Sequence, residues 1–157
     1  MIFQDPTSAL NPVFTIGDQF HAVLKRREGS ISRAAALARA TETLVEVSIH
    51  DPARLLASYP FQLSGGMNQR VMIAMALANA PALLLADEPG TALDVTVQEQ
   101  TLRLMRDLVA RHETAVLFIS HNLGVVREFA DRVYFIYRGR IVESGPTATV
   151  FEMPGHA

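Results

Sequence analysis

Residues 82–89 read Ala-Leu-Leu-Leu-Ala-Asp-Glu-Pro, and this stretch decides the fold class. A short apolar run that ends in acidic residues and a proline is typical of a strand buried in a parallel sheet. Residues 115–119 form a second run of this kind, and residues 96–111 between the two runs have the apolar periodicity of a helix. Because strand and helix alternate from residue 82 onward, the sequence predicts an α/β fold with a mostly parallel sheet and flanking helices.

The chain before this layer has no strand signal over residues 14–58. Thr15, Ser32 and the pair Asp51-Pro52 can each begin a helix, because an oxygen-bearing side chain caps the first turn and proline fits its first position. Residues 67–79 are apolar nearly all round, which predicts a buried helix. The first 13 residues combine a short apolar start with turn residues.

The last part of the chain is predicted to hold three small elements. They are a short helix over 123–130, a hairpin of strands 133–137 and 140–143 around Gly139, and a final helical turn over 147–151.

Composition excludes several classes of protein. The net charge of −2 argues against a nucleic-acid binder with a broad basic face. The absence of cysteine excludes disulfide frameworks, thiolate zinc sites and cysteine nucleophiles. The most apolar stretch, residues 71–86, is too short for a membrane span and is interrupted by Asn79 and Pro81. With no signal-peptide pattern at the start, we expect a cytoplasmic protein.

Ser64-Gly65-Gly66 precedes the predicted helix over 67–79. The two glycines allow a ligand to approach the backbone closely, and the free N–H groups of the helix start can bind a phosphate. A simpler interpretation is a serine cap after a flexible loop. The tripeptide alone does not decide between these two.

Polar residues follow both predicted strands. Asp87 and Glu88 end the first strand, where an aspartate can hold Mg²⁺ and a glutamate can orient or deprotonate a water. His121 follows the second strand and could bind a phosphate oxygen near those carboxylates. The alternative for Asp87 and Glu88 is that they only mark the end of a strand. The alternative for His121 is a structural role.

Taken together, these motifs resemble the ATPase subunit of ABC transporters. In that family Gln4 would be the Q-loop glutamine, Ser64-Gly65-Gly66 the signature motif, and Asp87-Glu88 the Walker B carboxylates. Asp94 would be the D-loop aspartate and His121 the switch histidine. Further segments resemble the oligopeptide, dipeptide and nickel importers of this family: Phe3 to Pro6, Leu10 to Phe14, Tyr59-Pro60, Arg70 to Leu77, Thr91 to Thr96, Ile141 to Gly145 and Pro154-Gly155-His156.

The resemblance implies a partial P-loop NTPase fold in three parts. Residues 1–13 would be the Q-loop segment, 14–66 a helical subdomain that ends in the signature motif, and 67–157 the C-terminal part of the α/β ATPase core. The implied function is the ATP-binding and ATP-hydrolysing subunit of a peptide-type importer.

The resemblance also implies a role for each motif residue. The catalytic residues would be Glu88, His121 and Gln4, and Asp87 with Gln4 would hold Mg²⁺. ATP would be bound by Ser64, Gly65, Gly66, Gln69 and Asp94.

The implied partners are a second ABC ATPase subunit, in a homo- or heterodimer, and membrane-spanning permease subunits. A solute-binding protein would take part indirectly, and no nucleic acid is expected. The permease subunits would hold the chain at the inner face of the plasma membrane.

One family motif is absent from the 157 residues. There is no G-x-x-x-x-G-K-[ST] phosphate loop, and Lys25, the only lysine, follows no glycine loop. We therefore expect no ATP hydrolysis by this chain alone and an open sheet, with residues 83–85 and 116–119 partly uncovered. The alternatives are a non-enzymatic half that docks on a partner ATPase or membrane subunit, and a non-transport ABC ATPase.

Overall fold

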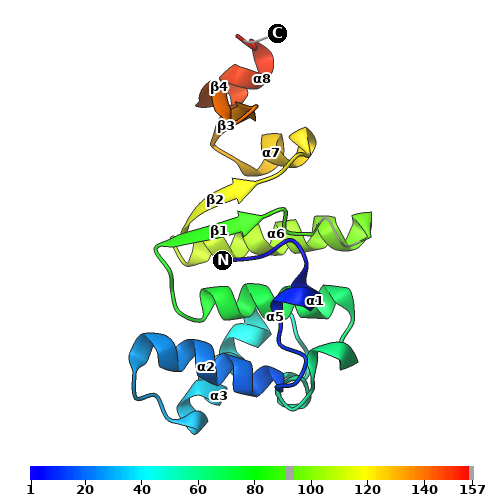
Figure 1. Cartoon of the computed structure of the whole chain (residues 1–157), viewed down its shortest axis with the longest axis vertical. Coiled ribbons are helices and arrows are strands. Elements are labelled where there is room, and N and C mark those ends of the chain that lie inside the picture. The colour runs from blue at the N-terminus through cyan, green and yellow to red at the C-terminus, as the bar shows by residue number, and fades with distance from the viewer. Residues whose placement is uncertain (91–93, 156–157) are drawn as a thin grey trace. The chain divides into compact units, whose positions relative to one another are not determined.

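The computed structural model describes residues 1–90 and 94–155, in two compact units (Figure 1). The first unit is Met1–Leu117 and the second is Phe118–Ala157, so that the boundary falls within a strand.

The first unit contains helices followed by a short sheet. Its helices are α1 (Pro6–Ala9), α2 (Ile16–Glu28), α3 (Arg33–Glu46), α4 (Pro52–Leu56), a 3₁₀ turn (Pro60–Gln62), α5 (Gly65–Leu77) and α6 (Val95–Arg111). Its strands are β1 (Leu83–Asp87) and the first residues of β2 (Ala115–Ile119), which pair with each other.

Helices α2, α3 and α4 begin where the sequence predicts. Thr15, Ser32 and Asp51 each accept a hydrogen bond from a backbone N–H in the first turn of the helix that follows. Gly29 ends α2 with a φ of 73°, a conformation that favours glycine. Phe20 and Leu24 of α2 are fully buried, whereas Val23 on the same helix is 36% exposed.

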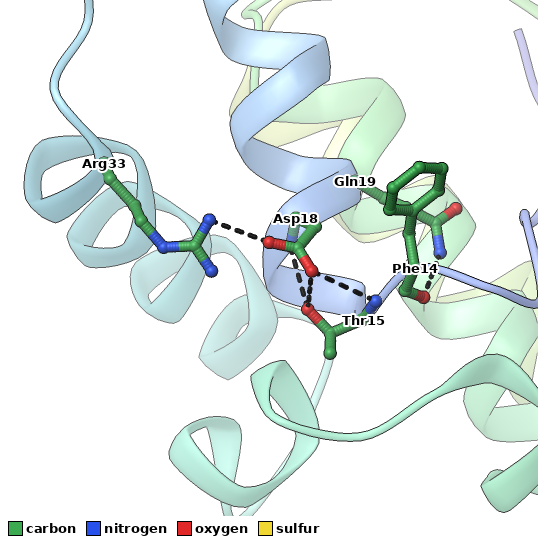
Figure 2. A network of polar contacts seen from close by, with 5 residues as sticks. All are labelled: Phe14, Thr15, Asp18, Gln19 and Arg33. Atoms are coloured by element: carbon green, nitrogen blue, oxygen red, sulfur yellow. Dashed lines mark hydrogen bonds and ion pairs between the residues drawn. The ribbon is translucent and has the colours of Figure 1, made fainter.

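A polar network joins the starts of α2 and α3 (Figure 2). The Thr15 hydroxyl donates to Asp18 Oδ2 at 2.6 Å, and the Asp18 N–H donates back to Thr15 Oγ1 at 3.2 Å. Arg33, at the start of α3, lies 2.7 Å from the other carboxylate oxygen of Asp18. The Thr15 hydroxyl first, and then Arg33, hold the pKa of the Asp18 carboxyl below its ordinary value.

Helix α5 forms the centre of the first unit. It lies between the α2–α3 pair and β1 in Figure 1. Val71, Ile73 and Ala74 have no exposed surface, which confirms the prediction of a buried helix. The helix begins at Gly65, two residues before the predicted start, because Ser64 rather than a later residue caps it.

The sheet of the first unit has a contribution that the sequence did not predict. Ile2 forms a parallel bridge with Ala86, so the start of the chain lies along β1. The turn residues after it form a helix, α1, capped by Asp5. A two-residue pairing carries no detectable periodicity, which explains why the pattern of residues 1–13 indicated only a turn.

The predicted open sheet is confirmed in the first unit. Leu84 and Ala86 of β1 are buried, whereas Leu83 is 56% exposed and Leu85 is 37% exposed. On β2, Leu117 is 50% exposed. The strands of this sheet are therefore buried on one face and partly uncovered on the other.

The second unit is a hairpin packed on short helices. It contains α7 (Leu123–Phe129), β3 (Arg132–Tyr137), β4 (Arg140–Pro146) and α8 (Thr147–Glu152). β3 and β4 pair antiparallel around Arg138 and Gly139, both with positive φ, which confirms the predicted turn. Phe135 of β3 packs against Phe151 of α8, with ring centroids 6.0 Å apart.

Replacing Asp18 with asparagine is expected to destabilise the first unit in a pH-dependent way. Because folding lowers the pKa of Asp18, its ionised form stabilises the fold above the unfolded value of 3.8. That stabilisation is lost as pH falls through the folded pKa. Urea unfolding of Asp18→Asn and of the wild type should therefore differ at pH 7 and converge near pH 2. The exposed α6 residue Asp107 supplies the control Asp107→Asn, and equal pH profiles for the two variants would contradict the assignment.

Candidate nucleotide-binding site

Three predicted site residues meet where β1 ends. Gln4 Nε2 donates a hydrogen bond to Glu88 Oε2 at 2.9 Å, and Asp87 immediately precedes Glu88 on the chain. Asp87 and Glu88 are half-buried, while Gln4 is exposed. Two residues that are 84 positions apart in the sequence thus contribute to one polar group at the end of the strand.

Backbone contacts on both sides fix the position of Gln4. The Ile2 N–H donates to the Leu85 carbonyl at 2.8 Å, and the Asp87 N–H donates to the Ile2 carbonyl at 3.0 Å. After Gln4, the Asp5 carboxylate caps α1 by accepting from the Thr7 N–H at 2.8 Å. This hydrogen bond is the main cause of a lowered pKa at Asp5. Gln4 therefore lies between a strand bridge and a capped helix.

The backbone at Glu88 is strained. Its φ of 45° lies in the left-handed region, which costs a residue other than glycine about 1–2 kcal/mol. The strain turns the chain sharply at the strand end, and Gly90 has a φ of 106° two residues later. Strain of this kind is concentrated at functional sites, where neighbouring contacts hold it in place. Here the Gln4 amide is one such contact.

The Ser64-Gly65-Gly66 motif lies at the start of α5. Ser64 Oγ accepts a hydrogen bond from the Met67 N–H at 3.3 Å, so the cap interpretation of the sequence is confirmed. This does not exclude phosphate binding, because the other N–H groups of the first turn have no partner within the helix. Gly66 lies against α6, and a Cβ at that position would be 3.1 Å from Val97 Cγ1.

Gln69 differs from the other predicted nucleotide-binding residues. It has no exposed surface, and neither its amide nitrogen nor its amide oxygen has a hydrogen-bond partner. Its side chain therefore has no surface that a nucleotide could contact in this structure. Thr101 of α6 is also fully buried, with an unpartnered hydroxyl.

Asp94 and His121 are both exposed. Asp94 immediately precedes α6, but its side chain does not cap the helix. His121 belongs to the second unit, between Ser120, whose hydroxyl accepts from the Asn122 N–H at 3.1 Å, and Asn122, which caps α7. The expected proximity of His121 to Asp87 and Glu88 would join the two units and stays a prediction. The motif residues Thr91–Leu93 and His156 lie outside the described residues.

The oxygen ligands at the end of β1 fit part of a magnesium site. Within residues 1–90 and 94–155 there is no group of three or more acidic, histidine or cysteine side chains that could hold a metal by itself. Magnesium in nucleotide sites is usually bound by one or two carboxylates together with phosphate oxygens and water. The Asp87 carboxylate and the Gln4 amide oxygen have the chemistry of the few protein ligands in a site of this kind.

Comparison with known proteins supplies the family. The model of the ABC transporter family matches residues 1–91, which is more than half of the chain. This chain belongs to the ABC transporter family. The probable peptide ABC transporter ATP-binding protein y4tR of Sinorhizobium fredii is 55% identical over 99% of this chain and 46% of its own length. The peptidoglycan transport ATP-binding protein YejF of Agrobacterium fabrum is 53% identical over 100% of this chain and 29% of its own length.

Solved structures of the family confirm the fold. The dimeric ATP-binding cassette MJ0796, in a post-hydrolysis state bound to ADP and Pi, aligns with a TM-score of 0.76 and 31% identity. The alignment covers 93% of this chain and 61% of the cassette. The chain thus has the fold of part of an ABC ATPase cassette, and it spans less than half the length of the two curated relatives named above. No helix in the described ranges is long and apolar enough to cross a membrane.

Sequence reasoning missed two contributors to this site. Ile2 positions Gln4 through the bridge to β1, and Asp5 caps the helix that follows. The Asp5-Pro6 pair was a usable signal, because an aspartate before a proline commonly begins a helix. The bridge at Ile2 had no comparable signal.

Glycine is expected to relieve the strain at position 88. Glu88→Gly and Glu88→Ala both remove the carboxylate and the contact with Gln4, but only glycine adopts a positive φ without a Cβ clash. Glu88→Gly should therefore be more stable than Glu88→Ala by about 1 kcal/mol, measured by urea unfolding. The control pair is Glu42→Gly and Glu42→Ala within α3, where alanine should be the more stable. The same order at both positions would contradict the strain at Glu88.

Proposed function

We propose that this chain is part of the ATP-hydrolysing subunit of a peptide-type ABC importer. The observation that carries the proposal is the hydrogen bond between Gln4 and Glu88 at the end of β1. It joins the Q-loop glutamine and the Walker B glutamate that the family resemblance names. The proposal is also supported by relatives such as y4tR, which is named a probable peptide ABC transporter ATP-binding protein.

The reaction is phosphoryl transfer from ATP to water, in which catalysis consists mainly of positioning and charge stabilisation. The Glu88 carboxylate would polarise the attacking water, and the Gln4 amide would hold that carboxylate in place. Asp87, with Gln4, would hold Mg²⁺, which when bound neutralises phosphate charge. His121 would stabilise the charge that develops on the γ-phosphate.

The signature motif would act across a dimer of ATPase subunits. Ser64, Gly65 and Gly66 lie at the exposed or half-exposed start of α5, where backbone N–H groups are available to a phosphate. They would contact the γ-phosphate of ATP bound to the second subunit, and Asp94 would link the two sites. The dimeric state of the cassette MJ0796 supports this arrangement. The buried Gln69 would support the motif from within α5.

Exposed aromatic side chains support a contact between the helical part and permease subunits. Phe14 is 52% exposed and Phe61 is 70% exposed, and Phe61 stacks on Tyr59 with ring centroids 5.5 Å apart. The Ile16 N–H donates to the Ser58 carbonyl at 2.9 Å, which brings the segments that carry these rings together. Exposed aromatic clusters are typical of protein interfaces. The importer would then act at the inner face of the plasma membrane, with a solute-binding protein delivering the substrate.

Replacing Glu88 with glutamine tests the catalytic proposal. In the assembled transporter that contains this chain, Glu88→Gln should lower the rate of ATP hydrolysis at least about 100-fold, because the amide cannot accept a proton. ATP binding, measured with a fluorescent analogue, should persist and should trap the dimer. Glu42→Gln on the exposed side of α3 serves as the control. Hydrolysis at the wild-type rate in Glu88→Gln would refute the role of Glu88.

Replacing Phe61 with aspartate tests the permease contact. A carboxylate at this position should lower the yield of permease co-purified with the ATPase subunits about tenfold, because burying an unpaired charge is costly. Ile136→Asp is the matched control, since Ile136 is also 70% exposed and lies in the second unit. Equal losses of permease in the two variants would argue against a specific contact at Phe61.

A further inference from the structure

Two polar side chains are enclosed between α5 and α6 with their hydrogen-bonding groups unpaired. Gln69 of α5 and Thr101 of α6 have no exposed surface. Across the described part of the chain, the amide nitrogen and oxygen of Gln69 and the hydroxyl of Thr101 have no hydrogen-bond partner. Unpaired polar groups in a protein interior are costly, so they almost always bind another protein group or an ordered water.

The two helices run in the same direction. α5 leads after five residues into β1, and α6 leads after three residues into β2. The Ala115 N–H donates to the Ala82 carbonyl at 3.0 Å. One residue earlier, the Thr114 hydroxyl donates to the Pro81 carbonyl at 3.1 Å, so β1 and β2 start side by side. Both helices therefore end at the same edge of the sheet, and they lie alongside each other in Figure 1.

One contact fixes which turns of the two helices face each other. A Cβ at Gly66 would lie 3.1 Å from Val97 Cγ1, so these two positions oppose one another. Gln69 follows Gly66 by three residues and Thr101 follows Val97 by four, which is one helical turn in each case. Because the helices run in the same direction, Gln69 and Thr101 lie opposite each other, one turn further along.

The next turns of this interface are apolar. Ile73 lies four residues after Gln69, and Met105 and Leu108 lie on the face of α6 that carries Thr101. All three have no exposed surface. Isoleucine and leucine side chains have no hydrogen-bonding atom, and a methionine sulfur is only a weak acceptor. These neighbours therefore enclose the polar pair without satisfying it.

The polar neighbours of Gln69 on α5 are bonded to other segments. Asn68 Nδ2 donates to the Pro60 carbonyl at 3.0 Å. The Arg70 guanidinium donates to the Val47 carbonyl, at the end of α3, at 2.7 Å. Gln69 is thus directed at α6, while the residues on either side of it hold the preceding loop and α3.

We propose that Gln69 and Thr101 bind ordered water between α5 and α6. The two side chains face each other but do not bond directly, and polar groups too far apart for a direct bond are commonly bridged by water. Water can accept from the amide nitrogen, donate to the amide oxygen and bond the hydroxyl in either sense. Buried waters typically satisfy polar groups of this kind.

The bridge positions the signature motif relative to Asp94. Gly65 and Gly66 form the first turn of α5, and Asp94 immediately precedes α6. Both helix starts lie within two turns of the polar pair, so the spacing that the water sets is passed to both. Gln69 and Thr101 are positioning residues in this scheme. This role rests on the proposed function, which assigns ATP to the two motifs, whereas the water site itself does not.

A double-mutant cycle tests the shared site. Thr101→Val and Gln69→Met remove hydrogen-bonding groups at similar side-chain volume. Each single change leaves the opposite group without its bridge, so it should raise the unfolding equilibrium constant at least about fivefold in urea unfolding. The double variant should lie within about threefold of the wild type, because an apolar pair needs no partner. Stabilisation by either single change, or effects that multiply in the double variant, would overturn the shared site.

Thr114→Val is the matched control for this substitution. Thr114 is 5% exposed, and its hydroxyl bonds the Pro81 carbonyl beyond the end of α6. Its effect on the unfolding constant should multiply with that of Gln69→Met, as for independent sites.

A crystal structure of the 157-residue chain distinguishes water from a direct bond. We expect ordered water within hydrogen-bond distance of both the Gln69 amide and the Thr101 hydroxyl. A direct bond between these side chains, or bonds from Gln69 to another protein group, would overturn the proposal.

Hydrolysis by the assembled transporter that contains this chain tests the positioning role. Thr101→Val should raise the KM for ATP at least about threefold and leave kcat within about twofold, because a displaced signature motif weakens closure around ATP. Thr101→Ser keeps the hydroxyl and should keep the wild-type KM, as should the control Thr114→Val. An unchanged KM in Thr101→Val would overturn the positioning role. Coupling in the cycle together with full hydrolysis by Glu88→Gln would count against the proposed function alone.

Discussion

The parallel bridge between Ile2 and β1 is the contact on which the candidate site depends. Two backbone hydrogen bonds, from the Ile2 N–H and to the Ile2 carbonyl, attach the start of the chain to the strand that ends in Asp87. Without them, Gln4 would have no fixed position relative to Glu88. The bond between these two side chains is exposed, so it contributes little stability by itself and depends on the backbone that aligns it.

Local signals predicted the helices of this chain well because their causes are local. Thr15, Ser32 and Asp51 cap helices through hydrogen bonds from the N–H three residues later, and such bonds leave a readable pattern. The turn at Gly139 is equally local. The same holds for the cap at Ser64, where the residue types of the first turn are sufficient to place the start of α5 within two positions.

The remaining features depend on contacts between distant segments. The pairing of Ile2 with Ala86 and the contact of Gln4 with Glu88 leave no periodic trace in the sequence. The family resemblance named Gln4 and Glu88, but not the positive φ at Glu88. The resemblance also placed Gln69 among the nucleotide ligands; its side chain is fully buried in this structure, and its role stays a prediction. A motif specifies residue types and their order, not which side of a helix each residue occupies.

The contact between Gly66 and Val97 has a consequence for how variants of the signature motif are interpreted. Any side chain larger than hydrogen at position 66 would press on α6, since its first carbon would already lie 3.1 Å from Val97 Cγ1. Gly66 is therefore a spacer between two helices as well as a proposed point of ligand approach. A defect caused by Gly66→Ala would combine loss of the proposed nucleotide contact with a displaced α6, and the compensating change Val97→Ala would separate the two effects by restoring only the helix spacing.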